Sequence, residues 1–300
     1  YARKSMCPVA LMPDSEGKGY YRWSVDDGGW PRLAAVLDRL DDGEALSYAA
    51  NLSSALWSGR LDFGRYRALL VPVARRKDAV AAAPLDDIDF ILQQFTGEPA
   101  LFGPLADWAR DLYGRPPAAA SLPGIEEDEA ATGRAYEHRV LAFYLRSLGD
   151  KTVRAELAEQ GQALLSRFEE DGKAIAPVPA TGDLALLALI KADDSKEGEA
   201  GSRLLRGLDR LPDAQRAMSL WALARSGDGA LADDLLQMIG GGSLSGDDAL
   251  QAMSGMLEVP STRPQAWSWL EANVDRLVQT VPDDRAKEIV ELGRFFCREE

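Results

Sequence analysis

The stretch from Gly19 to Trp30 divides this sequence into two parts with different hydrophobic periods. Tyr21, Trp23 and Val25 alternate with their neighbours, which is the period-two pattern of a half-buried strand. An Asp-Asp-Gly-Gly run then interrupts this pattern. A Trp-Pro pair opens the first helical stretch, where the N–H that proline lacks would be unpaired anyway. The sequence therefore predicts a strand-to-helix junction, with a domain boundary between residues 25 and 26.

Residues 1–25 are predicted to form a short β-hairpin. Pro8–Met12 would be one strand and Tyr20–Val25 the other, joined by a turn rich in Asp, Ser and Gly. A lone hairpin is only marginally stable in water, and this one carries several aromatic side chains. We therefore expect it to belong to a sheet whose other strands lie outside this chain.

Residues 26–300 show the spacing of amphipathic helices, with short breaks between successive helical stretches. Gly182–Ala192 is nearly all apolar, which implies a helix buried on every side. Breaks at Gly227, Pro260 and Pro282 fall on residues that commonly end helices. Short turns favour helical hairpins packed side by side, and no fixed-period repeat is visible. We therefore predict an all-α fold, a superhelix of stacked helical hairpins of the armadillo or HEAT type.

Composition and charge argue against two classes of partner. The 300 residues are 46% hydrophobic and 27% charged, which is typical of a folded chain. The formal net charge of -14 argues against nucleic acid, because binding to a duplex needs a cationic surface. No apolar run approaches the roughly 20 residues of a membrane helix, so no membrane partner is expected either.

Histidine and cysteine counts limit the chemistry that this chain can perform. His138 is the only histidine, and it stands in a charged helical stretch, where a solvated role is expected. Cys7 and Cys297 lie at opposite ends, and we expect two free thiols, with a disulfide left open. One histidine and two distant cysteines cannot supply a two-histidine zinc motif or a four-cysteine site. A serine or cysteine nucleophile would have to use His138 as its base. We therefore expect no metal, no cofactor and no catalytic residue within this chain.

The junction resembles the C-terminal region of zinc aminopeptidases of the aminopeptidase N family. In that family a Gly-Tyr-Tyr-Arg motif ends a small β-sandwich domain, and a tryptophan eight residues after the arginine opens a helical domain. The motif and its spacing are reproduced here by Gly19, Tyr20, Tyr21, Arg22 and Trp30. These five residues form the predicted structural junction, in which Arg22 would pack or bond across the boundary.

The likeness continues along the chain. Leu211-Pro212 resembles the opening of a late helix of the family, and Arg263, four residues before Trp267, resembles its arginine-to-tryptophan helix. Two positions depart from the family pattern. Ala45 and Asn51 stand where the family usually has an arginine and an aspartate, so we expect a structural ion pair to be lost.

The resemblance implies a fragment of a larger enzyme. Residues 1–25 would be the terminal hairpin of a truncated β-sandwich domain, and residues 26–300 the helical C-terminal domain. The zinc of the family is held by an H-E-x-x-H helix and a downstream glutamate in a catalytic domain that this chain does not contain. In the family the helical domain closes the substrate cavity and limits peptide length. The expected partners are the catalytic and β-sandwich domains of the same parent chain and the peptide substrate.

Asp248 and Arg263 are the candidate substrate-cavity residues. Arg263 is predicted in the first turn of a helix, where the helix dipole disfavours a cation. Asp248 on the preceding helix is the predicted partner. The alternative is that Arg263 points into the concave face and binds a peptide carboxylate.

A second functional class also fits the pattern, namely a free-standing helical-repeat scaffold that binds a partner protein on its concave face. An aromatic hairpin without a sheet favours the aminopeptidase interpretation, because a scaffold has no use for one.

Overall fold

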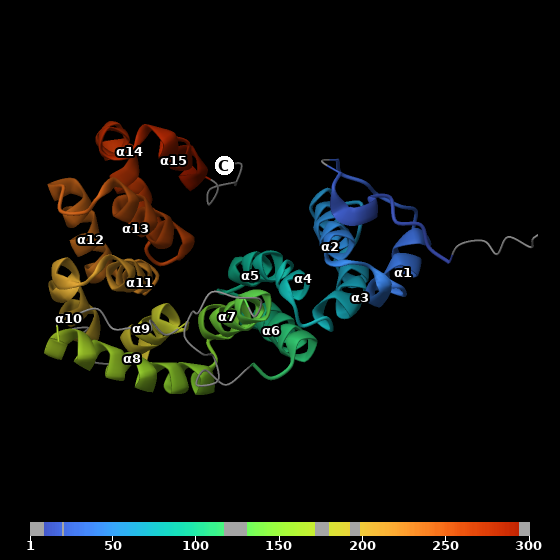
Figure 1. Cartoon of the computed structure of the whole chain (residues 1–300), viewed down its shortest axis with the longest axis horizontal. Coiled ribbons are helices and arrows are strands. Elements are labelled where there is room, and N and C mark those ends of the chain that lie inside the picture. The colour runs from blue at the N-terminus through green and yellow to red at the C-terminus, as the bar shows by residue number, and fades with distance from the viewer. Residues whose placement is uncertain (1–8, 20, 117–130, 172–179, 193–198, 294–300) are drawn as a thin grey trace, which may run out of the picture. The chain divides into compact units, whose positions relative to one another are not determined.

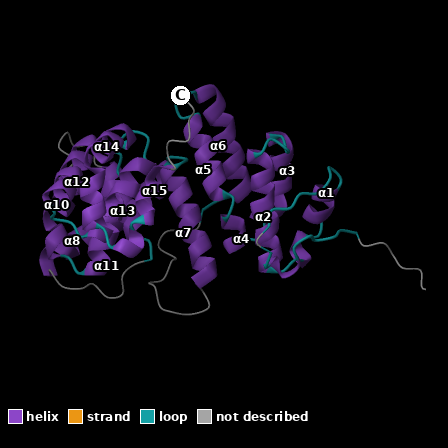
Figure 2. Cartoon of the chain, turned by 90° about the horizontal axis from the view of Figure 1, so that it is seen from above, coloured by secondary structure: helices purple, strands orange, loops and turns teal. Residues whose placement is uncertain are grey.

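The computed structural model describes residues 9–19, 21–116, 131–171, 180–192 and 199–293, and all regular elements of this part are helical (Figure 1, Figure 2). These residues fall into two compact units, one up to Leu148 and one from Gly149. None of the described helices is both long and apolar enough to cross a bilayer. The predicted all-α class is therefore confirmed for this part of the chain.

The first unit is built around α3, which contacts α1, α2, α4 and α6. Its elements are η1 (Ser15–Gly17), α1 (Gly29–Ala34), η2 (Leu37–Arg39), α2 (Asp42–Trp57), α3 (Phe63–Ala74), α4 (Ala79–Ala82), α5 (Leu85–Gln94), α6 (Pro99–Tyr113) and α7 (Ala131–Arg146). Tyr48 of α2 and Tyr66 of α3 are fully buried at its centre. Helix α7 packs on α4 and α5.

Aspartate caps fix the starts of several helices in this unit. Asp41 accepts a hydrogen bond from the backbone N–H of Glu44, and the Glu44 carboxylate accepts one from the N–H of Asp41. This reciprocal capping box satisfies two amides that a helix start otherwise leaves unpaired. Asp62 and Asp78 cap α3 and α4 in a similar way. The boundaries therefore follow from local sequence.

The second unit is a stack of helical hairpins. Its elements are α8 (Lys151–Asp171), α9 (Gly182–Ala192), α10 (Glu199–Gly207), η4 (Leu208–Arg210), α11 (Asp213–Ala224), α12 (Gly229–Gly241), α13 (Gly246–Glu258), α14 (Arg263–Thr280), η5 (Asp283–Arg285) and α15 (Lys287–Glu291). Helix α11 contacts both α9 and α13, and α12 contacts α14, so alternate helices pack as layers (Figure 1).

The nearly all-apolar segment Gly182–Ala192 forms α9, most of whose side chains are buried. It packs closely on α8 because Gly161 of α8 has no β-carbon. A β-carbon there would lie 2.2 Å from the carbonyl oxygen of Ala185. Only glycine permits that approach. The hairpin stacking is thus present within this unit, whereas an armadillo or HEAT-like superhelix is not confirmed.

The β-hairpin predicted for residues 1–25 is not confirmed either. The described residues of this segment contain no strand (Figure 2); Ser15–Gly17 is a short 3-10 helix and residues 22–26 have no regular structure. Side chains take the backbone N–H groups that a strand would offer to its neighbour. The N–H of Trp23 donates to Asn51 Oδ1 at 2.9 Å, and that of Gly19 to Asp14 Oδ1 at 2.8 Å. The segment therefore docks on α2, and the proposed boundary at residues 25 and 26 stays a prediction.

Candidate functional site

An aromatic cluster joins the N-terminal segment to the helices. The rings of Trp23 and Trp30 stack with centroids 5.4 Å apart, and Trp30 meets Tyr48 edge-on at 5.7 Å. Trp23 Nε1 also donates to Ser47 Oγ at 3.1 Å. Trp30 is buried, and aromatic contacts of this kind add to the stability gained by burying the ring surface. The junction tryptophan is thus part of the core of the first unit.

The other predicted junction residues take different places. A β-carbon at Gly19 would lie 2.4 Å from the Tyr21 ring and 2.8 Å from Asp14 Oδ1, so a larger residue there would displace these side chains. Tyr21 is 54% exposed and donates its hydroxyl to the Pro13 carbonyl oxygen at 2.7 Å. Arg22 is exposed, and its Nη1 lies 3.4 Å from the Ala50 carbonyl oxygen. Tyr20 lies outside the described residues.

Asn51 and Ala45, the two departures from the family pattern, are both buried. The amide of Asn51 bonds in both directions: Oδ1 accepts from Trp23 and Nδ2 donates to the Ser47 carbonyl oxygen at 2.8 Å. An ionised carboxylate could accept the first bond but could not donate the second. The asparagine therefore fits this position without an arginine partner.

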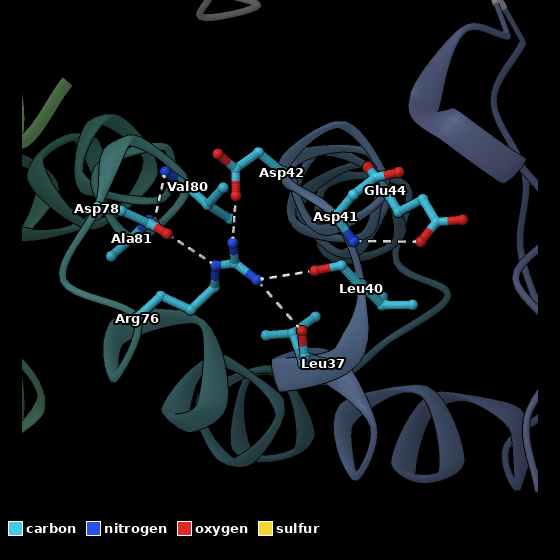
Figure 3. Close-up of polar contacts among 9 residues, drawn as sticks. All are labelled: Leu37, Leu40, Asp41, Asp42, Glu44, Arg76, Asp78, Val80 and Ala81. Atoms are coloured by element: carbon cyan, nitrogen blue, oxygen red, sulfur yellow. Dashed lines mark hydrogen bonds and ion pairs between the residues drawn. The ribbon is translucent and has the colours of Figure 1, made fainter. Parts of the chain in front are cut away.

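Arg76 is the centre of a polar network in the first unit (Figure 3). Its Nη1 donates to the carbonyl oxygens of Leu37 and Leu40, both at 3.3 Å, and its Nη2 pairs with Asp42. Its Nε lies 2.9 Å from Asp78 Oδ2. One guanidinium thereby holds the end of η2, the start of α2 and the cap of α4 together, which is a structural role.

The pair predicted between Asp248 and Arg263 is wrong. Asp248, near the start of α13, pairs with Arg216 of α11. Arg263 donates from Nε to the Leu257 carbonyl oxygen at 2.7 Å and from Nη2 to that of Glu258 at 3.1 Å. Those carbonyls end α13, roughly 14 Å along its axis from Asp248. The last carbonyls of a helix lack intrahelical partners and attract a cation, which is the physical reason for the placement. The substrate role of either residue stays a prediction.

A cavity of about 390 Å³ lies in the second unit, and we call it the α13–α15 cavity. Its walls include Asp247, Gln251 and Ser254 of α13, and Arg225, which follows α11. Pockets of this size commonly hold small molecules or single side chains. This cavity is therefore considered as a candidate binding site.

The remaining polar wall comes from the C-terminal part of the chain. Arg285 Nη1 lies 2.6 Å from Asp247 Oδ1, and its Nη2 lies 2.7 Å from Glu288 Oε2. Hydrogen bonds with Glu288 and Asp247 raise the pKa of Arg285, and the bond from Arg285 lowers the pKa of Glu288. Arg285 therefore links η5 to the start of α13 through an ion pair. The three-residue spacing of Arg285 and Glu288 can be seen in the sequence, whereas the ion pair between Arg285 and Asp247 cannot.

Among the described residues, no group of three or more His, Cys, Asp or Glu is placed to hold a metal ion. His138 is half-buried on α7. Cys7 and Cys297 both lie outside the described residues, so their pairing is untested.

The protein-family model described as the ERAP1-like C-terminal domain matches residues 11–299. This match is consistent with the C-terminal helical domain of an aminopeptidase N-family enzyme. No curated protein matches the chain.

Proposed function

Because the chain belongs to the ERAP1-like C-terminal domain family, we propose that it closes the substrate cavity of a zinc aminopeptidase and has no peptidase activity alone. The family match over residues 11–299 is the observation that carries this proposal. Zinc would be held by the catalytic domain of the same parent chain, since one histidine cannot supply a two-histidine motif. The catalytic and β-sandwich domains and the peptide are the proposed partners.

The internal packing of each unit supports a role as a wall. Several charged side chains make contacts that fix neighbouring segments: Asp248 pairs with Arg216, Arg263 bonds to the end of α13, and Arg76 bonds to three segments. Fixed cationic and anionic groups of this kind hold a surface in one shape, and a rigid wall excludes long peptides more sharply than a flexible one. Length restriction is therefore the proposed contribution of this domain.

The test compares the parent aminopeptidase with a form that lacks residues 26–300. An aminoacyl reporter measures the catalytic centre, and a series of peptides of increasing length measures access. We expect the shortened enzyme to keep reporter hydrolysis and lose its length dependence. Unchanged length dependence would contradict the cavity-closing role. Residues 1–300 alone should release no reporter product, and activity lost on chelation would contradict the non-catalytic assignment.

A free-standing scaffold is the second candidate, and one observation favours it. Trp23 stacks on Trp30 of α1, and its backbone N–H donates to Asn51 of α2, so this aromatic residue is buried within the first unit without a sheet among the described residues. The feature that was expected to separate the two functions therefore does not do so. A chain that is encoded and expressed without a catalytic domain would support the scaffold, and a common reading frame would reject it.

A further inference from the structure

The α13–α15 cavity carries a ligand preference of its own. We propose that it binds an organic cation, an amine or a guanidinium group. The proposal is independent of the aminopeptidase assignment, because it rests on the charges, the hydrogen-bonding atoms and the apolar surface of this cavity alone.

The charges of the cavity wall favour a cation. Arg285 is paired with both Asp247 and Glu288, and Arg225 Nε lies 2.8 Å from Glu258 Oε2. Both guanidinium groups of the wall are thus neutralised by carboxylates. Glu291 adds a further carboxylate to the wall, with no ion pair among the described residues. The wall and its direct ion-pair partners therefore carry excess negative charge, which attracts a cation and repels a carboxylate.

The neutral polar groups of the wall offer acceptors. Gln251 uses its Nε2 to donate to the Ala217 carbonyl oxygen at 3.0 Å, which leaves its carbonyl oxygen as the group for a ligand. The hydroxyl of Ser254 can accept as well as donate. An ammonium carries three donors and a guanidinium five, and neither has an acceptor. Together with Glu291, these side chains match such a ligand.

Apolar surface in the same cavity suits the carbon chain of such a ligand. Leu250 and Leu292 line it, and the Arg225 guanidinium lies 4.7 Å from the centroid of the Trp221 ring. Methylene chains of lysine, arginine and polyamines bury on apolar surface while the charged end binds acceptors. Two sources carry this chemistry, a basic side chain of a peptide and a free polyamine.

The first experiment titrates the 300-residue chain with agmatine in a calorimeter, at low and at moderate salt. We expect saturable binding that weakens with salt, and about tenfold weaker binding in Glu291→Gln, because one charge-assisted hydrogen bond is lost. Glu271→Gln is the matched control, since Glu271 is an exposed glutamate of α14 outside the cavity. Equal binding by the two variants, or no binding by the unsubstituted 300-residue chain, would overturn the proposal.

Ser254→Leu gives a second variant, because it fills the cavity and leaves every charge in place. It should abolish agmatine binding, and its thermal melt establishes that it folds. Should it misfold, Ser254→Ala takes its place, and we expect weaker binding from the loss of one acceptor. N-acetylglutamate should not bind the unsubstituted 300-residue chain. Saturable binding of this anion with no binding of agmatine would reverse the assignment.

The final arm separates the two sources. Spermidine is compared with a blocked peptide that carries one internal lysine, and with the same peptide carrying norleucine. Preference for the lysine peptide assigns a peptide side chain, and preference for spermidine assigns a free polyamine. Binding of neither would contradict the proposal. All of these measurements use the chain without a catalytic domain, so their failure leaves the aminopeptidase test unaffected.

Discussion

Arg76 and Asp78 form an ion pair in which Arg76 Nε lies 2.9 Å from Asp78 Oδ2, while the other oxygen of the same carboxylate caps α4. The cap bonds run from the N–H groups of Val80 and Ala81, at 3.0 and 3.2 Å. One carboxylate thereby links the residue that organises η2 and α2 to the start of another helix (Figure 3). The Arg76 side chain is only 15% exposed, so water cannot readily replace these bonds.

Arg76→Ala should lower the free energy of unfolding by about 2–3 kcal/mol, because the carbonyls of Leu37 and Leu40 and the Asp78 carboxylate lose a charged donor. Arg76→Lys should recover only part of this loss, since an ammonium cannot span the same fork. Urea unfolding measures both variants. Arg60→Ala is the control, because Arg60 is exposed; an equal effect of the two alanine variants would contradict the role of Arg76.

Helical elements with one strong local signal could be predicted from the sequence. The nearly all-apolar run Gly182–Ala192 forms α9 with those same bounds, because such a pattern has one stable solution, a helix buried on all sides. The alternation of Tyr21, Trp23 and Val25 predicted a strand that is not confirmed among the described residues. An extended chain places successive side chains on opposite sides whether or not another strand pairs with it. Here Trp23 faces α2 and Tyr21 faces solvent, with no sheet among the described residues.

The candidate site was harder to predict than the helices. The position of Arg263 at the start of α14 was correct, yet its partners are carbonyls at the end of α13, which no side-chain pattern reveals. The α13–α15 cavity joins Arg225, Asp247 and Glu291, residues far apart in sequence. Their meeting depends on how α11, α13 and the C-terminal segment pack, and helical periodicity fixes the buried face of each element but not its neighbour.

Asn51→Ala should destabilise the fold by about 2 kcal/mol, because the buried N–H of Trp23 and the Ser47 carbonyl oxygen both lose a partner. Thermal unfolding followed by circular dichroism measures the stability of the variant. Asn273→Ala is the comparison, since that amide makes a single bond to the backbone of its own helix. If the two variants melt alike, Asn51 does not anchor the N-terminal segment.

Arg216 and Asp248 should show coupling in a double-mutant cycle, and Arg263 and Asp248 should show none. The first two residues form an ion pair between α11 and α13. Asp248 lies near the start of α13, whereas Arg263 begins α14 and bonds to carbonyl oxygens at the end of α13. Residues in contact depart from additivity by about 0.5–3 kcal/mol. Urea unfolding of Arg216→Ala, Arg263→Ala, Asp248→Ala and the two double variants gives both energies. Coupling between Arg263 and Asp248 would restore the pair that the sequence predicted.

Acid should remove the contribution of Glu288 to stability. The hydrogen bond from Arg285 lowers the pKa of Glu288 below its usual 4.5 in the folded chain. A carboxyl group whose pKa is lower in the folded state binds fewer protons there. The contribution of Glu288 to stability is therefore complete above pH 4.5. It disappears as the pH falls through the lowered pKa that Glu288 has in the folded chain. We expect the wild-type chain to have a higher melting temperature than Glu288→Gln at neutral pH. This gap in melting temperature should close below pH 4.5. High salt should narrow the gap at neutral pH, because this pair is partly exposed. A gap that persists in acid would show that Glu288 acts through packing and not through its charge.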